Sequence, residues 1–233
     1  MCFSAGASFG AGAVLAIVGI TAVKQSCNPS QLPFAFIPLI FAVQQVTEGF
    51  VWLSLSNPAD IFLLKPATFI FLTFAYVVWP AWVPFSILLL EKNPKRKNIL
   101  SAILAIGLVV SIYLAHRLLT QHIHAGISGM HIVYDLGTPG YLLHYSAILY
   151  FAATVLPGFI SGTNKMWIFG SSIAIAYFVT RIFFQNYELS VWCFFAAIIS
   201  SVVFTVILGL KQAFLHDMAA GVATAGFHSH PSS

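Results

Sequence analysis

The sequence predicts an all-α membrane protein, a seven-transmembrane-helix bundle, and three observations support this prediction. Hydrophobic residues make up 59% of the 233 residues and charged residues only 7%, which leaves too little polar surface for a water-soluble domain of this size. Several stretches reach the roughly 20 apolar residues that a helix needs to cross the hydrocarbon core of a bilayer. The links between these stretches are short and rich in turn residues, with one exception at 120–140.

Each predicted span is long and continuously apolar, as expected of a helix and not of a barrel strand. The spans cover 4–23, 33–56, 66–90, 99–119, 141–160, 166–185 and 190–210. We therefore expect a single transmembrane domain over 1–210, followed by a mobile cytoplasmic tail over 211–233.

Glycine and proline give two of these spans special properties. The spacing Gly6-x-x-x-Gly10 in the first span, with Gly12 and Gly19 further along, predicts close packing against neighbouring helices. Pro80 and Pro84 in the third span predict a kink, because each proline removes one backbone N–H from the helix.

Basic side chains predict the orientation of the bundle. Most fall on one side of the predicted membrane: Lys24, Lys92, Lys95, Arg96, Lys97, Lys165 and Lys211. The positive-inside rule places this side in the cytoplasm and the N-terminus outside. The net charge of +4 then reflects a belt facing anionic lipid, not a nucleic-acid surface. The expected location is a bacterial cytoplasmic (inner) membrane.

Most of the remaining polar residues that are unfavourable inside a membrane fall on the outer side. Glu48 is the acidic residue that lies furthest from the outer surface. It lies eight residues, about 12 Å of helix, before the end of the second span at residue 56. Gln44, Glu48 and Trp52 are spaced four apart and share one helical face. A carboxyl group at this depth faces the bundle interior, is protonated, or has a partner.

The sixth span carries a matching row at the same spacing, Tyr177, Arg181 and Gln185. We expect Arg181 to reach toward Glu48, with Gln44 and Tyr177 completing the hydrogen bonds. Two interpretations remain open: an inert buried ion pair that locks two helices, and a functional site.

The long connection, "QHIHAGISGMHIVYD", has metal-ligand chemistry and general-base chemistry. His131 is the preferred ligand or base, with Tyr134 and Asp135 as orienting partners or further ligands. The alternative is a wet outer loop in which the histidines are simply hydrated.

Its glycines, Gly126 and Gly129, allow the connection to fold back over the helices as a lid. We therefore expect His131 and Tyr134 to be buried and to face Glu48. His122 and His124 precede the glycines and are expected at the exposed rim.

Cys2 and Cys193 are both expected at the outer ends of their spans. They are compatible with a disulfide, with soft metal ligands alongside His131, or with buried free thiols. Removal of Met1 would also leave a free amino group beside the Cys2 thiol, the arrangement of an N-terminal nucleophile. Cys27 falls in a cytoplasmic loop and is expected to be reduced.

Taken together, these residues predict a membrane-embedded, metal-dependent enzyme that opens to the outer leaflet and acts on a lipid-like or small apolar substrate. Glu48, Tyr134 and Arg181 would be catalytic, and His131, Asp135, Cys2 and Cys193 would bind zinc or another transition metal. Two other classes stay open: a proton-coupled transporter that uses Glu48 and Arg181, and a haem-binding membrane protein. The expected partners are the bilayer and the substrate.

Several common activities are excluded. No HExxH, GxSxG, Walker or GxGxxG pattern occurs, so the usual protease, lipase and nucleotide-binding motifs are absent. The seventh span contains no lysine, which excludes a retinal Schiff base there.

Blocks of the sequence resemble a family of uncharacterised bacterial integral membrane proteins whose chains open with MCFSA. The blocks are "MCFSAGASFGAG", "PLIFAVQQVTEGFVW", "FAYVVWPAWVPFSILLLE", "HIVYD" and "SVWCFFAA". The resemblance implies a seven-span bacterial membrane protein and no particular activity. It adds weight to the residues inside the blocks, namely Cys2, Glu48, Trp52, His131, Tyr134 and Cys193.

A second comparison is with the seven-span ceramidase and adiponectin-receptor-like zinc hydrolases, which have a buried His/Asp site. This chain departs from them because its seventh span lacks the HxxxH pair. What carries over is the analogy of a zinc-assisted intramembrane hydrolase.

Overall fold

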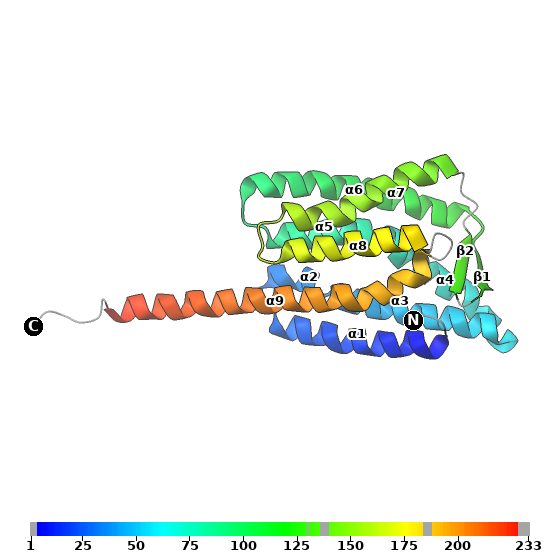
Figure 1. Cartoon of the computed structure of the whole chain (residues 1–233), viewed down its shortest axis with the longest axis horizontal. Helices are drawn as coiled ribbons and strands as arrows, with labels where there is room; N and C mark the ends of the chain where they lie inside the picture. Colours follow the sequence, from blue (N-terminus) through cyan, green and yellow to red (C-terminus); the bar gives the residue numbers. More distant parts are fainter. Residues whose placement is uncertain (1–3, 130, 136–139, 184–187, 228–233) are drawn as a thin grey trace, which may run out of the picture.

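Figure 1 shows a computed structural model of the chain, a bundle of long helices with a short β-hairpin across one end. The structure describes residues 4–129, 131–135, 140–183 and 188–227, and the side chains of all of these except 140–144, 188–194 and 221–227.

The helices and strands follow the predicted spans closely, with breaks inside the second and third. In chain order they are α1 (Ala5–Gln25), η1 (Pro29–Gln31), α2 (Leu32–Ala35), α3 (Ile37–Ser56), η2 (Pro58–Leu63), α4 (Leu64–Leu72), η3 (Thr73–Val78), α5 (Trp79–Leu90), α6 (Pro94–Thr120), β1 (His124–Ser128), β2 (His131–Asp135), α7 (Gly140–Ile160), α8 (Met166–Phe183) and α9 (Glu188–Phe227).

In the described part of the chain, six helical segments are long and apolar enough to cross a membrane. They are Ala5–Gln25, Pro29–Ser56, Pro58–Leu90, Pro94–Thr120, Met166–Phe183 and Phe195–Ala220. The apolar part of α7 with described side chains, Tyr145–Ile160, is shorter. The prediction of an all-α, multi-pass membrane protein is confirmed at this level, with six to seven long apolar helices.

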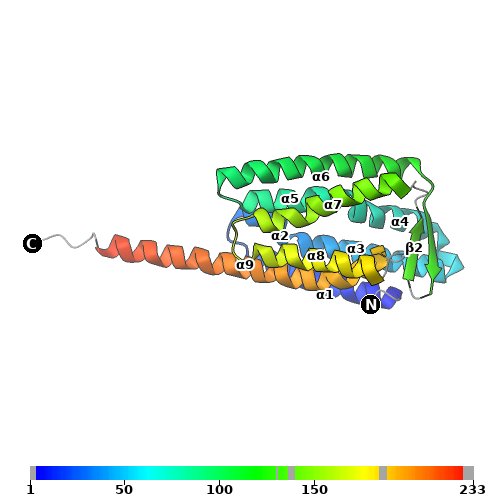
Figure 2. The ribbon, with the colours of Figure 1, turned by 45° about the horizontal axis from the view of Figure 1, so that its top comes forward.

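The bundle has two chemically different ends. One, which we call the hairpin end, carries β1 and β2 beside the C-terminal ends of α3, α6 and α8 (Figures 1 and 2). The other, the basic end, carries Lys92 and Lys165 in the links before α6 and α8, and Lys95, Arg96 and Lys97 in the first turn of α6. There Lys211 donates a hydrogen bond to Gln25 (Nζ to Oε1, 2.6 Å), which ties α9 to the end of α1.

Helix α9 does not end at residue 210, where we placed the boundary of the transmembrane domain. It continues to Phe227 and projects well beyond the basic end of the bundle (Figure 1). The side chains of 212–220 are exposed along this projection. The first part of the segment assigned to a tail is therefore helical.

Helix α1 packs closely on α3, but not through the glycines of the Gly6-x-x-x-Gly10 spacing. A Cβ at either of those positions would meet nothing within 4 Å. The contact falls on Gly12 and Gly19 instead, where a Cβ would lie 2.9 Å from Val46 and 2.6 Å from Leu39. Close packing of the first span is thus confirmed, through glycines seven residues apart.

The predicted kink in the third span is a π-helical segment, η3, just before Pro80. A proline has no N–H to donate, so carbonyl groups in the preceding turns lose their helical partner. The hydroxyl of Tyr150 in α7 donates to the Ala75 carbonyl oxygen at 2.7 Å. The hydroxyl of Ser111 in α6 donates to that of Val77, also at 2.7 Å. Side chains of neighbouring helices therefore donate hydrogen bonds to carbonyl groups in the break, as an apolar environment requires.

Glu91 fixes the links at the basic end. Its carboxylate accepts backbone N–H groups of Lys92 and Asn93 at 3.0 and 2.9 Å, and that of Gly162 at 2.6 Å. Burial alone would raise the pKa of Glu91, but the backbone hydrogen bonds lower it by more, so its pKa lies below the ordinary value. The ionised carboxylate joins the α5–α6 link to the α7–α8 link.

Beside the π-helical break, helices α5 and α6 make a close contact that can be tested by mutation. A Cβ at Gly107 in α6 would overlap the carbonyl group of Pro80. Gly107→Ala is expected to destabilise the protein by about 1–3 kcal/mol, since helices α5 and α6 must separate. Gly209→Ala is the matched control, because a Cβ there would meet nothing within 4 Å. Thermal unfolding in detergent checks this, and equal midpoints for the two variants would contradict it.

Candidate functional site

A row of buried polar side chains runs along α3. Glu48 has no exposed surface, and Gln44 and Gln45 are 5% and 1% exposed. Gln45 donates to the Glu48 carboxyl group (Nε2 to Oε2, 3.3 Å). Trp52 continues the row one turn nearer the hairpin end and is also buried. The predicted face of α3 is therefore confirmed as an interior face.

Gln44 has a different partner from the one we expected. Its Oε1 accepts a hydrogen bond from Trp79 Nε1 at 2.9 Å. The Trp79 ring also packs against Phe41, with ring centroids 4.1 Å apart. Tyr177, the other predicted partner near Glu48, packs against Phe151 at a centroid distance of 4.7 Å. Trp79 directly follows the π-helical break η3.

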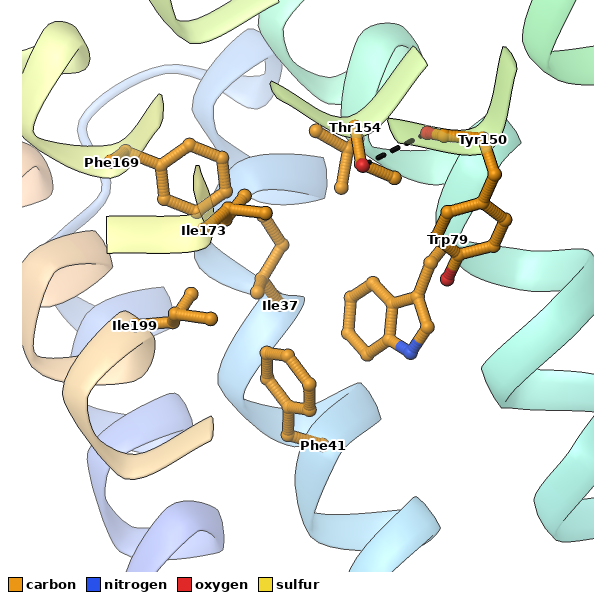
Figure 3. A pocket seen from close by; sticks show the side chains of 9 residues that line it. Ile37, Phe41, Trp79, Tyr150, Thr154, Phe169, Ile173 and Ile199 are labelled. Atoms are coloured by element: carbon orange, nitrogen blue, oxygen red, sulfur yellow. Dashed lines mark hydrogen bonds between the residues drawn. The ribbon is translucent and has the colours of Figure 1, made fainter. Parts of the chain in front are cut away.

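A small apolar cavity lies beside the rings of Trp79 and Phe41 (Figure 3). Its volume is about 20 Å³, and its walls include Ile37, Phe41, Trp79, Phe169 and Ile173. A space of this size holds roughly one water-sized group. A lipid chain does not fit into it, so a larger substrate would have to approach Glu48 from elsewhere.

The β-hairpin covers the hairpin end of α3. Ile132 in β2 is 1% exposed and packs in one cluster with Val51, Trp52 and Ala67. Tyr134, two residues on, stacks on Phe71 with ring centroids 5.0 Å apart. Gly129 has a φ of +63°, the left-handed conformation of a tight turn. The predicted lid is thus a two-stranded hairpin seated on α3 and α4.

The hairpin separates the predicted site residues. His122 and His124 are exposed, as predicted, whereas His131 and Tyr134 are half-buried. Side chains alternate along a strand, so His131 and Tyr134 project from opposite faces of β2. The face of Tyr134 and Ile132 is the one that packs on α3 and α4. A contact between His131 and Glu48 stays a prediction.

His131 has the protonation state that a ligand or base requires. Burial lowers the pKa of His131 below its ordinary value near 6.5, which favours the neutral imidazole. Asp135, at the other end of β2, is exposed. The two residues are four apart in a strand, so they share a face but are separated by roughly 13 Å of extended chain.

The metal site remains a prediction. Cys2 and the side chain of Cys193, two of its four expected ligands, lie outside the described residues. Among the side chains that the structure does describe, no three His, Cys, Asp or Glu residues are grouped so as to hold a metal ion. Cys27 is a half-buried free thiol.

Arg181 lies in the last turn of α8 and its side chain is exposed. The preceding residue, Thr180, is 1% exposed and faces the interior. The predicted pairing of Arg181 with Glu48 is neither shown nor contradicted, and Gln185 lies outside the described residues.

Sequence reasoning missed Trp79 as a hydrogen-bond donor, and it missed Arg117 and Tyr113 on α6 as a half-buried polar pair. All three groups have atoms enclosed by protein. The spacing of four between Tyr113 and Arg117 was a usable signal, because it places both on one face of a helix end.

The seating of the hairpin is tested by two isoleucines that face each other across its strands. Ile127 and Ile132 are register partners, but Ile127 is 44% exposed and Ile132 is 1% exposed. Ile132→Ala is expected to cost about 2–4 kcal/mol through lost burial, and Ile127→Ala less than about 0.5 kcal/mol. Hydrogen exchange of 124–135 should accelerate only in Ile132→Ala. Equal exchange in both variants would show that the hairpin does not rest on Ile132.

Comparison with known proteins gives one match. Residues 1–225 match the model of a family of unknown function, DUF6629. No curated protein and no solved structure matches the chain. The match covers nearly the whole sequence, and the chain therefore belongs to this family of unknown function.

Proposed function

We propose that this protein is a membrane-embedded enzyme that acts on a lipid-like or small apolar substrate, with Glu48 as its general acid or base. The observation that carries the proposal is the complete burial of Glu48 in the interior row of α3. A carboxyl group inside a membrane bundle is costly, and such residues usually mark a functional site.

The surroundings of Glu48 suit proton transfer to a substrate that arrives from the hairpin end. Glu48 lies eight residues before Ser56, the last residue of α3, so it is about 12 Å below that end. Trp52 and the hairpin residue Ile132 lie on the path between them. A shift of the hairpin would open this path while the deeper part of the bundle stays closed. Tyr134 on the hairpin would then act beside the substrate.

Orientation supports an opening toward the outer leaflet. We propose seven spans with the N-terminus outside, α7 being the fifth, in the cytoplasmic membrane of a bacterium. The basic end then faces the cytoplasm, as the positive-inside rule requires, and the hairpin end faces outward. Arg181 is exposed at that surface, at the end of α8.

The metal is a separate part of the proposal. His131 would join Cys2 and Cys193 in holding zinc or another transition metal. Asp135, predicted as a further ligand, lies at the opposite end of β2, roughly 13 Å along the strand from His131, and would not reach the same ion. A bound ion of this kind would supply a polarising charge or an activated water. Elemental analysis of purified protein tests this part separately, and it fails if no stoichiometric zinc, copper or iron is present.

The experiment compares Glu48→Gln with Asp60→Asn in nanodiscs made from a bacterial lipid extract. Asp60 lies in the exposed link η2, where Asn57 donates to it at 2.9 Å, so it is a matched carboxyl control. The native protein and Asp60→Asn are expected to convert at least one lipid species. Glu48→Gln should lower that rate by about 100-fold or more while it unfolds at the same temperature or higher. Mass spectrometry of the lipids and thermal unfolding are the measurements.

Two outcomes would contradict the proposal. In the first, the native protein leaves every lipid species unchanged. In the second, Glu48→Gln loses activity only in proportion to its loss of folded protein, which would make Glu48 a purely structural residue.

A second candidate is a proton-coupled transporter, and the break in the third span favours it. The π-helical segment η3 lies next to Trp79, which is hydrogen-bonded to the polar row of α3. Discontinuous helices of this kind form moving parts in transporters. Acidification of proteoliposomes under a pH gradient, lost in Glu48→Gln and unaccompanied by any change in lipid, would favour transport over catalysis.

A further inference from the structure

Arg117 is a half-buried cation with two nitrogen atoms that find no partner among the described residues. It lies in the last turn of α6 at the hairpin end. Its Nε and Nη2 atoms are shielded from solvent and make no hydrogen bond in the described structure. A guanidinium group is always charged, so enclosing it without an anion or water is unfavourable.

Tyr113 lies one turn below Arg117 on the same face of α6, and it too has a polar atom that is covered and unpartnered. Its hydroxyl group is also shielded and has no hydrogen-bond partner among the described residues. Together the two side chains present a phenolic O–H and guanidinium N–H groups, which are all donors suited to an anion. Both residues keep part of their surface exposed, but these three donor atoms are covered, so a ligand reaches them through a local movement of the two side chains.

An Arg near a helix end often turns its charged group out toward water and lipid headgroups. Arg117 does not do this with its Nε and Nη2, which point into protein. Two of the acidic residues are engaged elsewhere: Asp60 is bonded to Asn57, and Glu91 binds backbone N–H groups at the opposite end of the bundle.

We propose that Arg117 and Tyr113 form a binding site for a phosphate group. The planar guanidinium can donate two parallel hydrogen bonds to phosphate oxygens, and the Tyr113 hydroxyl can donate a third from one turn deeper. The last turn of a membrane-spanning helix lies at the depth of the lipid headgroups. A lipid phosphodiester and free inorganic phosphate share this chemistry. The site is independent of Glu48 and of the proposed reaction.

The test measures thermal unfolding of delipidated protein in a neutral detergent. One arm compares added phosphatidylglycerol with diacylglycerol, which lacks the phosphate. The other compares sodium phosphate with sodium chloride at equal ionic strength. The phosphate-bearing compound should raise the Tm of the native protein by about 5–10 °C at a hundredfold excess over Kd. A rise in the first arm alone identifies a lipid, and a rise in the second a free phosphate.

Substitutions at Arg117 and Tyr113 show whether the rise in Tm comes from this site. Arg117→Gln should abolish the rise and, without added phosphate, should unfold at the same or a higher temperature than the native protein, because it removes an uncompensated charge. Tyr113→Phe should reduce the rise. Lys65→Gln is the matched control, since Lys65 is an exposed cation at the start of α4, and it should respond like the native protein.

The proposal is overturned if the native protein responds equally to both members of each pair, or if Arg117→Gln responds as the native protein does. If Arg117→Gln cannot be purified, Arg117→Lys replaces it. A lysine keeps the charge but lacks the paired donors, so a reduced rise is expected and an unchanged rise overturns the proposal.

Discussion

Helix α3 carries two glutamines and a glutamate through the apolar part of the bundle, and the face that bears them must therefore be enclosed by protein. This requirement is visible in the burial of the spans. In the most apolar stretch of Pro29–Ser56, 61% of the residues are buried, against 28–33% in the other described spans. The remaining helices, by contrast, expose a large apolar surface, as expected of helices that face lipid.

The neighbours of α3 are shaped by this requirement. Helix α1 lies close because Gly12 and Gly19 leave room for side chains of α3. The third span is broken directly before Trp79, whose N–H bonds to Gln44. The break in turn leaves backbone carbonyls without helical partners, and Tyr150 and Ser111 satisfy two carbonyls of this segment. Gln44 and the two carbonyl groups of the break thus obtain their partners from other helices, whereas Gln45 and Glu48 bond to each other within α3.

Sequence reasoning located the spans because hydrophobicity over some 20 residues is a local property. It predicted a break near Pro80 but not its π-helical form, which is stabilised by a hydroxyl 75 residues away in the chain. It predicted a lid in 120–140 but paired His131 with Tyr134. Only the strand pairing of β1 and β2 shows that these residues project from opposite faces. The partner of Gln44 and the enclosure of Arg117 likewise depend on tertiary packing that no local pattern contains.

The central claim is that the hairpin controls access to Glu48, and the rate at which a water-soluble carbodiimide modifies Glu48 tests it most directly. The protein is treated in nanodiscs with carbodiimide and an amine nucleophile, and the Glu48 peptide is quantified by mass spectrometry. The account predicts slow modification in the native protein and in Ile127→Ala, and faster modification in Ile132→Ala, which loosens the hairpin above Trp52. Equal rates in all three proteins would contradict it.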